Sequence, residues 1–187
     1  MHMEPISGFV TADLHDAAYA IYTSGTTGNP KGVLHEYGNL ERAIESIKLN
    51  GVTPFGSKDR LALLAPLNFV ASVIVILKAL SIPCGRSYIV PYTVIKNPLK
   101  LMKFFLEKRI TITFLTPSYV RKIGNKTGPF LRMLFVGSEP ANNIYKKNLT
   151  LINIYACSES GFAVGTFEID QSYEVCPVGK PEVSTEI

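Results

Sequence analysis

Residues 18–32 read AYAIYTSGTTGNPKG, and this stretch decides how the rest of the chain is interpreted. An apolar run leads into four hydroxyl side chains, two glycines, a proline and one lysine, with no carboxylate between Thr23 and Lys31. One interpretation is a surface hairpin loop, because Gly, Asn-Pro, Ser and Thr are ordinary turn residues. The other is a phosphate-binding loop, because glycines let backbone N–H groups approach an anion closely and Lys31 adds a positive charge.

This loop differs from the Walker phosphate loop. That motif ends in Gly-Lys-Ser/Thr and opens a helix at once. Here Pro30 precedes Lys31, Gly32 follows it, and the next residues are expected to be extended. The helix geometry of the Walker loop therefore does not apply, and the loop is expected to run from one strand into another.

Strands and helices are expected to alternate along the chain. The expected strands cover residues 19–22, 32–34, 61–65, 87–90, 111–115, 133–136, 151–155 and 164–169. The expected helices begin at Asn39 and Asn97 or cover residues 69–80, 117–123 and, weakly, 142–147. This order predicts an α/β fold with a mostly parallel sheet flanked by helices. Residues 18–187 are expected to form one partial domain, and residues 1–17 a tag or flanking segment.

The clearest helix signal starts at Asn97-Pro98. Proline is well placed in a first helical turn, where its missing N–H would have no partner anyway. Leu99, Met102, Phe105 and Leu106 then recur at helical spacing. The pattern predicts an apolar stripe that packs on the sheet.

Composition excludes several classes of protein. The 187 residues carry a formal charge of +4, and the lysines and arginines are scattered except at Lys146 and Lys147, so a nucleic-acid-binding surface is not expected. The three cysteines form no CxxC pair and the three histidines show no ligand spacing, which is typical of reduced thiols in a cytoplasmic protein. The apolar run 69–80 is too short to span a bilayer and predicts a buried helix instead.

The segment YTSGTTGNPKGV, residues 22–33, strongly resembles the phosphate-loop signature of the adenylate-forming superfamily. This superfamily includes acyl-CoA synthetases, luciferases and the adenylation domains of nonribosomal peptide synthetases. Three further family-like segments follow in the expected order: FVGSEP (135–140), NIYACSES (153–160) and CPVGKP (176–181). The chain is therefore identified as a central piece of the large N-terminal, AMP-binding domain of such an enzyme.

The resemblance implies a two-step reaction. A carboxylic acid attacks the α-phosphate of ATP to form an acyl-adenylate, and a thiol of CoA or of a carrier protein's phosphopantetheine then takes the acyl group. The catalytic lysine of this family belongs to a small C-terminal domain that we expect to be missing here, so no catalytic residue is assigned. A non-catalytic nucleotide-binding or interaction module that retains the scaffold is the alternative.

The resemblance also assigns binding roles residue by residue. Glu159 takes the place of the glutamate that holds Mg²⁺, and Ala156-Cys157 replace the usual Gly-Pro beside it. Tyr155 is expected against the adenine ring and Asn153 at its amino edge. The implied nucleotide-binding set is Thr23, Ser24, Gly25, Thr26, Thr27, Gly28, Lys31, Gly137, Ser138, Glu139, Asn153, Tyr155 and Ser158.

The implied acid pocket is wholly apolar. Its residues are Val70, Ala71, Ile74, Phe114, Val136, Ile154, Phe162 and Ala163. Val70 replaces the aspartate that pairs with the substrate's α-ammonium in peptide-synthetase relatives, which predicts an apolar acid, fatty or aryl, rather than an α-amino acid. The identity of the thiol that accepts the acyl group is left open. A carrier protein is favoured by Phe69, Ala71 and Ser72 and by the pair Asn39-Leu40, whereas Val70 favours CoA.

Overall fold

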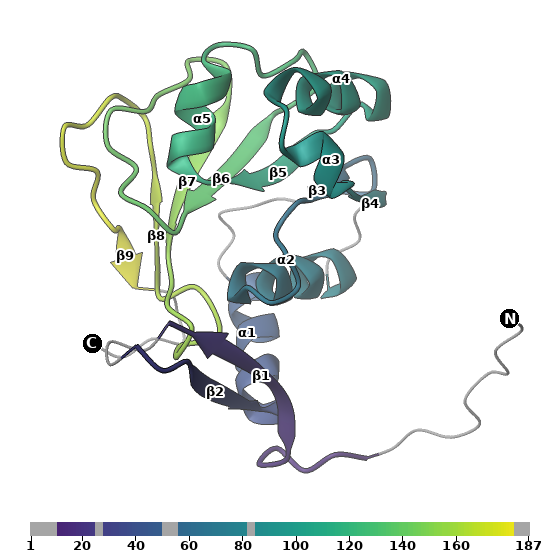
Figure 1. The fold of residues 1–187 in the computed structure, drawn as a ribbon, viewed down its shortest axis with the longest axis vertical. Coiled ribbons are helices and arrows are strands. Elements are labelled where there is room, and N and C mark those ends of the chain that lie inside the picture. Colours follow the sequence, from purple (N-terminus) through teal and green to yellow (C-terminus); the bar gives the residue numbers. More distant parts are fainter. Residues whose placement is uncertain (1–10, 25–27, 50–55, 82–84, 182–187) are drawn as a thin grey trace, which may run out of the picture.

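The computed structural model describes residues 11–24, 28–49, 56–81 and 85–181 (Figure 1). Its strands form a two-stranded antiparallel hairpin and a separate seven-stranded sheet. The strands are β1 (Ala17–Thr23), β2 (Lys31–Glu36), β3 (Arg60–Leu63), β4 (Arg86–Ile89), β5 (Ile112–Leu115), β6 (Met133–Gly137), β7 (Thr150–Tyr155), β8 (Gly165–Glu168) and β9 (Lys180–Pro181).

The helices connect the strands. They are α1 (Tyr37–Leu49), α2 (Val70–Ser81), α3 (Tyr92–Ile95), α4 (Pro98–Lys108) and α5 (Pro117–Ile123). Helix α1 lies beside the hairpin and α2 (Figure 1). Helix α2 packs on one face of the sheet, while α4 and α5 pack on the other (Figure 1). None of the helices in the described ranges is long and apolar enough to cross a membrane.

The large sheet has the strand order β4-β3-β5-β6-β7-β8-β9. The first five strands in this order are parallel, and β8 and β9 join antiparallel at the end. In the sheet, β4 lies on one side of β3, and β5, the next strand in the chain, lies on the other side of β3. The strand order therefore reverses at the β3–β5 boundary, and in doubly wound sheets ligands bind beyond the carboxyl ends of the strands at this point.

The predicted α/β class is confirmed. The large sheet has a hydrophobic cluster on each face, because successive side chains of a strand point to opposite faces. Leu134, Val136 and Leu151 point to one face, where they pack with Leu101 and Phe105 of α4. Met133, Phe135 and Ile152 point to the other, toward α2. Because both faces are covered, β6 is buried along its whole length, as expected for a central parallel strand.

Some sequence predictions of secondary structure were wrong. Residues 142–147 form turns rather than a weak helix, because Asn143 adopts φ 55° and its N–H donates to the carbonyl of Tyr173 at 2.7 Å. Helix α1 begins at Tyr37, two residues earlier than predicted. Strand β9 was not predicted, since its two residues show no periodicity of their own.

The stripe predicted on α4 faces the core only in part, through Phe105, which is buried, and Met102, which is half-buried and packs against the core. Leu101 and Phe105 are the buried residues of this helix, whereas Leu99 and Leu106 are exposed. The start of the helix is as predicted, because the Asn97 side chain accepts hydrogen bonds from the N–H groups of Leu99 and Lys100.

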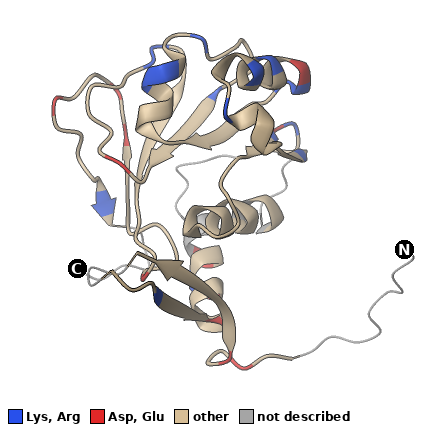
Figure 2. Cartoon of the chain, in the orientation of Figure 1, with Lys and Arg blue, Asp and Glu red and all other residues tan. Residues whose placement is uncertain are grey.

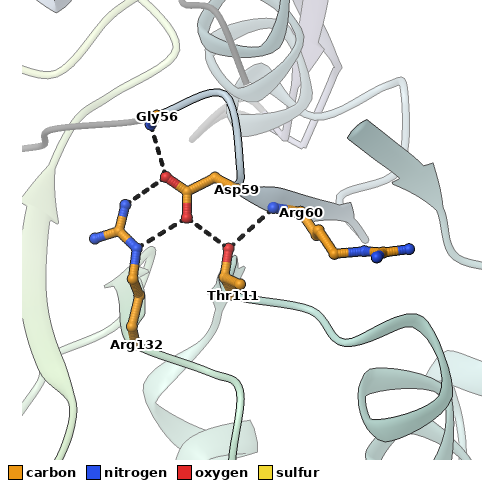
Figure 3. A network of polar contacts seen from close by, with 5 residues as sticks. All are labelled: Gly56, Asp59, Arg60, Thr111 and Arg132. Carbon is orange, nitrogen blue, oxygen red and sulfur yellow. Dashed lines mark hydrogen bonds and ion pairs between the residues drawn. The ribbon is translucent and has the colours of Figure 1, made fainter. Parts of the chain in front are cut away.

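A polar network ties the amino ends of three neighbouring strands together (Figure 3). The Asp59 carboxylate accepts hydrogen bonds from Arg132 at 2.8 and 2.5 Å, from the Thr111 hydroxyl at 2.7 Å and from the Gly56 N–H at 2.8 Å. Thr111 in turn accepts from the Arg60 N–H at 2.9 Å. The network lies at the edge of the sheet opposite the carboxyl ends of β3, β5 and β6.

Positive charge is more concentrated, along the sequence and in space, than the description of scattered lysines and arginines implied (Figure 2). Residues 96–147 hold eleven of the nineteen lysines and arginines but only two of the fifteen acidic residues. Figure 2 shows the basic residues gathered on α4, α5 and the loops beside them. More than half of the positive charges are thus carried by the elements at one end of the molecule (Figure 2).

Candidate functional site

An apolar cavity of about 50 Å³ lies at the carboxyl ends of the parallel strands, between α2 and the sheet. Five of the eight predicted acid-pocket residues line it: Val70, Ala71, Ile74, Phe114 and Ile154. Phe69, Val75, Phe135, Gly137, Ser138 and Ala156 complete the wall. The cavity therefore brings together residues from α2, β5, β6 and β7, which are far apart in sequence.

Local structure explains how α2 presents its side chains to this cavity. The turn before the helix is closed by the N–H and hydroxyl of Ser72, both of which donate to the carbonyl of Phe69 at 2.8 Å. Val70, Ala71 and Ile74 follow at helical spacing and are all buried. One face of the first turns of α2 thus forms the apolar side of the cavity.

Gly137 keeps the cavity open on the sheet side. A Cβ at this position would lie 2.7 Å from the carbonyl oxygen of Ile154 and 3.4 Å from the ring of Phe114. Any larger residue would push β6 away from β7 or fill the space beside Phe114. The glycine of the FVGSEP segment is therefore required by packing at the cavity wall.

Three predicted pocket residues do not line the apolar cavity. Val136 is fully buried on the opposite face of the sheet, because successive side chains of a strand point to opposite faces. Phe135, the preceding residue of the strand, lines the cavity where Val136 was predicted to lie, so the prediction was off by one residue on this strand. Phe162 and Ala163 are half-buried in the segment between β7 and β8 and do not line this cavity.

A second, more polar cavity of about 480 Å³ adjoins the first. Four residues of the predicted nucleotide set line it: Ser138, Glu139, Asn153 and Tyr155. Ser138, Ile154 and Ala156 line both cavities, so the two meet at the ends of β6 and β7. Gly137 borders the apolar cavity rather than the polar one.

Hydrogen bonds fix the walls of the polar cavity. The Glu139 carboxylate accepts from the N–H of Ser118 at 3.0 Å and from its hydroxyl at 2.8 Å, which ties the end of β6 to α5. Asn153 is buried and its amide donates to the carbonyl of Pro177 at 2.9 Å. The side-chain N–H of Asn153, which was predicted to face adenine, is thus bonded to the CPVGKP segment. The Tyr155 side chain is half exposed.

The end of β6 carries an unusual backbone conformation. Ser138 has φ 72°, a left-handed conformation that few residues other than glycine adopt. Such strained positions cluster at binding sites, where the surrounding structure holds them in place. Here the turn directs the chain from the apolar cavity into the polar one.

The TSGTTGNP segment joins the two strands of the hairpin. Thr23 pairs with Lys31 in the antiparallel register, and the Thr23 hydroxyl donates to the Lys31 carbonyl at 3.5 Å. Ser24, Gly28 and Lys31 are exposed. Gly25, Thr26 and Thr27 lie outside the described residues.

A buried histidine connects this hairpin to the segment that carries Ser158 and Glu159. His35 on β2 is 2% exposed, and its Nε2 lies 2.7 Å from the carbonyl oxygen of Ser158. Its ring stacks on Tyr19 of β1, with the ring centroids 4.7 Å apart. Lys31 lies four residues away on the same strand, about 13 Å along it. The sequence analysis missed His35, because β2 has no apolar–polar alternation that marks this position as buried: its neighbour Leu34 is the exposed one.

Glu159 fits a magnesium ion held mainly by substrate oxygens. Its carboxylate is exposed, and within the described ranges no group of three or more His, Cys, Asp or Glu residues is placed to hold a metal ion. Mg²⁺ is commonly bound through one or two carboxylates together with phosphate oxygens and water. A single exposed carboxylate therefore suits this ion where phosphate oxygens and water supply the other ligands.

The chain is similar to known proteins along most of its length. A sequence model of the family described as AMP-binding enzyme matches residues 6–187. The chain is 32% identical to Tyrocidine synthase 1 of Brevibacillus parabrevis over 98% of its length, and 32% identical to Gramicidin S synthase 1 of Brevibacillus brevis over 92%. It spans only 18% and 16% of these two relatives.

Solved structures share the fold. The Vibrio cholerae adenylation domain AlmE, in complex with glycyl-adenosine-5'-phosphate, matches with a TM-score of 0.76 at 24% identity, over 91% of this chain and 34% of that one. The Klebsiella oxytoca NpsA N-terminal subdomain, in complex with 3-hydroxybenzoyl-AMSN, matches with a TM-score of 0.80 at 20% identity, over 97% of this chain and 49% of that one.

Proposed function

The chain belongs to the AMP-binding enzyme family, and on that premise we propose that its two adjoining cavities bind an acyl-adenylate. The AMP part would occupy the polar cavity and the acyl group the apolar one. As part of a larger ligase, the site would form this adenylate from ATP and a carboxylic acid and pass the acyl group to a thiol of CoA or phosphopantetheine.

The observation that carries this proposal is the wall shared by the cavities. Ser138, Ile154 and Ala156 border both the apolar space of about 50 Å³ and the polar space of about 480 Å³. A ligand with an apolar end, a reactive junction and a large polar end suits this arrangement. An acyl-adenylate has these three parts in this order.

We propose that the hairpin supplies the phosphate contacts. Thr23, Ser24, Gly28 and Lys31 offer hydroxyl, backbone and ammonium donors, and the implied roles of Gly25, Thr26 and Thr27 remain part of this proposal. Lys31 would counter the negative charge that collects on the leaving pyrophosphate. Glu159 would hold Mg²⁺, which neutralises phosphate charge when it is bound, and Ser158 would donate to the α-phosphate.

The apolar cavity favours a small aliphatic acid. A dry cavity of about 150 Å³ is the size known to hold benzene, so a space of about 50 Å³ suits a short acyl chain better than an aryl ring. Val70 is 5% exposed and gives no counter-charge to a substrate ammonium. An ammonium placed there would be desolvated without a partner, which costs several kcal/mol.

Calorimetric titration of this chain tests the proposal. ATP·Mg²⁺ and a non-hydrolysable butanoyl-adenylate analogue are titrated into the wild type, Lys31→Ala, Glu159→Ala and Lys147→Ala, the last being an exposed lysine outside both cavities. We expect Lys31→Ala and Glu159→Ala to weaken ATP·Mg²⁺ about tenfold or more, and Lys147→Ala to change nothing. Equal affinities in all four proteins would overturn the assignment of the loop.

The same titration separates the two candidate functions. An adenylation site is expected to bind the acyl-adenylate analogue more tightly than ATP, because enzymes bind reaction intermediates and transition states preferentially. A non-catalytic nucleotide-binding module has no reason to recognise the acyl group, so the analogue would then bind no more tightly than ATP·Mg²⁺.

A further inference from the structure

Helix α4 exposes an apolar stripe on its outer surface. Leu99 is 68% exposed and Leu106 is 50% exposed, with the half-buried Met102 between them. Spacings of three and four residues place these side chains on one face of the helix. Leu101 and Phe105 pack against the sheet and Met102 packs partly against the same core, so Leu99 and Leu106 are the residues of this face that the described core leaves exposed.

The amino-terminal half of the stripe forms one wall of a groove between α4 and the end of α5. The groove has a volume of about 640 Å³, and Leu99, Met102 and Ile123 supply apolar surface within it. Lys96, Lys122 and Lys126 also line it. The groove thus joins apolar surface to a rim of three ammonium groups.

The rim charges are available to a partner. In the described part of the chain, no carboxylate forms an ion pair with Lys122 or Lys126, and both side chains are exposed. The ammonium group of Lys96 lies 4.4 Å from the ring centroid of Tyr92, a contact that leaves its charge uncompensated. An anionic partner would therefore meet three cations without having to displace an existing ion pair.

Hydrogen bonds beneath the surface hold the groove in shape. The Tyr119 hydroxyl of α5 donates to the carbonyl of Ile95 at 2.6 Å, just before α4. Lys146 donates to the carbonyl of Gly124 and lies 3.4 Å from the Asn125 side chain, which fixes the loop leading to Lys126. A preformed groove loses little conformational entropy on binding.

We propose that this groove is a docking surface for an acidic amphipathic helix of a partner protein, separate from the adenylate cavities. Helix-in-groove recognition uses apolar anchors at spacings of three and four residues, as on α4, and the basic rim selects acidic flanks. A concave groove fits the ridge of a helix better than a flat lipid surface. Nucleic acid would use the charges but would leave the apolar floor without a role.

A defined probe tests this proposal on the full chain. It is a fluorescein-labelled helical peptide of about 16 residues, with leucines at spacings of three and four and glutamates elsewhere. A scrambled peptide of the same composition removes the stripe while keeping the charge. Phosphatidylserine vesicles and a short DNA duplex represent the other two classes of anionic partner.

We expect the patterned peptide to bind more tightly than the scrambled one, and to weaken about tenfold in a Lys122→Glu/Lys126→Glu double variant. Leu99→Ser should weaken it as well, while the matched Lys58→Glu/Lys147→Glu variant, exposed and outside the groove, should stay within about twofold. Circular dichroism verifies folding of each variant. No binding of the peptide up to about 1 mM, equal binding of both peptides, or stronger binding to vesicles or DNA would overturn the proposal.

Failure of this test is distinguishable from failure of the proposed adenylate site. The groove variants contain none of the residues that line the two cavities, so their affinity for ATP·Mg²⁺ should equal that of the wild type. Likewise, Lys31→Ala should bind the peptide as the wild type does.

Discussion

The Nε2 of His35 donates a hydrogen bond of 2.7 Å to the carbonyl oxygen of Ser158, and this bond joins two elements of the proposed site. A carbonyl only accepts hydrogen bonds, so the proton must lie on the histidine nitrogen. His35 belongs to the hairpin that carries Lys31, and Ser158 precedes Glu159. The contact therefore sets the position of the hairpin relative to the proposed magnesium ligand.

Replacing His35 with phenylalanine should separate these elements while keeping an aromatic ring against Tyr19. The Ser158 carbonyl would lose its donor, which costs about 1–3 kcal/mol in a buried setting. We expect this loss in urea unfolding and a weaker affinity for ATP·Mg²⁺ in calorimetry. His15 is the matched control, because it is exposed, and His15→Phe should change stability by less than about 0.5 kcal/mol. Unchanged stability and affinity in His35→Phe would show that the contact does not matter.

Gly161 should tolerate no side chain, because His35 occupies the space where a Cβ would lie. That Cβ would be 2.7 Å from two atoms of the imidazole ring, and Gly161 also has φ 69°. We expect Gly161→Ala to destabilise the protein by about 2–4 kcal/mol in urea unfolding. Gly28 separates the cost of the backbone conformation from the cost of the clash. It has φ 84°, but a Cβ added there would meet nothing within 4 Å, so Gly28→Ala should cost only about 1 kcal/mol. Equal costs at both positions would argue against the contact with His35.

Local sequence signals were sufficient for most of the fold. Short β-branched and apolar runs bounded by turns predicted β5, β6 and β7 at the correct places, and Asn97-Pro98 marked the start of α4 through a cap that the structure contains. These signals are local, since capping and strand alternation depend on neighbouring residues. The ordered motifs then indicated which strand ends would meet.

One error came from misusing a local pattern, whereas other features depend on contacts that no local pattern records. Assigning Val136 to the pocket ignored the alternation that turns it to the opposite face, which a stricter use of strand periodicity would have prevented. The orientation of α4 is set by how the whole helix packs, and its two apolar faces were equally plausible from spacing alone. His35 and Ser158 are 123 residues apart, so only the fold brings them together.

The Asp59 network should contribute stability that disappears in acid. Burial by itself would raise the pKa of Asp59, but hydrogen bonds from Arg132, Gly56 and Thr111 outweigh it and hold this pKa below its ordinary value. A carboxyl with a lowered folded-state pKa stabilises the fold above its unfolded pKa of about 4, and this contribution is lost as the pH falls below that value. We expect the free energy of unfolding to fall more steeply below about pH 4 in the wild type than in Asp59→Asn.

At neutral pH, Asp59→Asn should lower the free energy of unfolding by about 2 kcal/mol, because it removes the charge of a buried carboxylate from its ion pair with the partly exposed Arg132. The exposed pair of Lys103 and Glu107, 3.8 Å apart, is the control. Glu107→Gln should change stability by less than about 0.5 kcal/mol and should leave the acid dependence unaltered. Parallel pH profiles of wild type and Asp59→Asn would contradict the role of the network.

Introducing a carboxylate at Val70 should change which adenylates the apolar cavity accepts. Val70 is buried in the first turn of α2 and faces the cavity wall formed by Phe114, Phe135 and Ile154. An aspartate there would supply the counter-charge that a substrate ammonium lacks, so Val70→Asp should favour an alanyl-adenylate analogue over the butanoyl one by about tenfold relative to the wild type. The buried charge will also lower stability, so Val70→Asn serves as the matched control: it is similarly polar and of similar size but carries no charge. If Val70→Asp and Val70→Asn alter the preference equally in calorimetry, charge pairing is not the cause, and the acyl group does not lie beside residue 70.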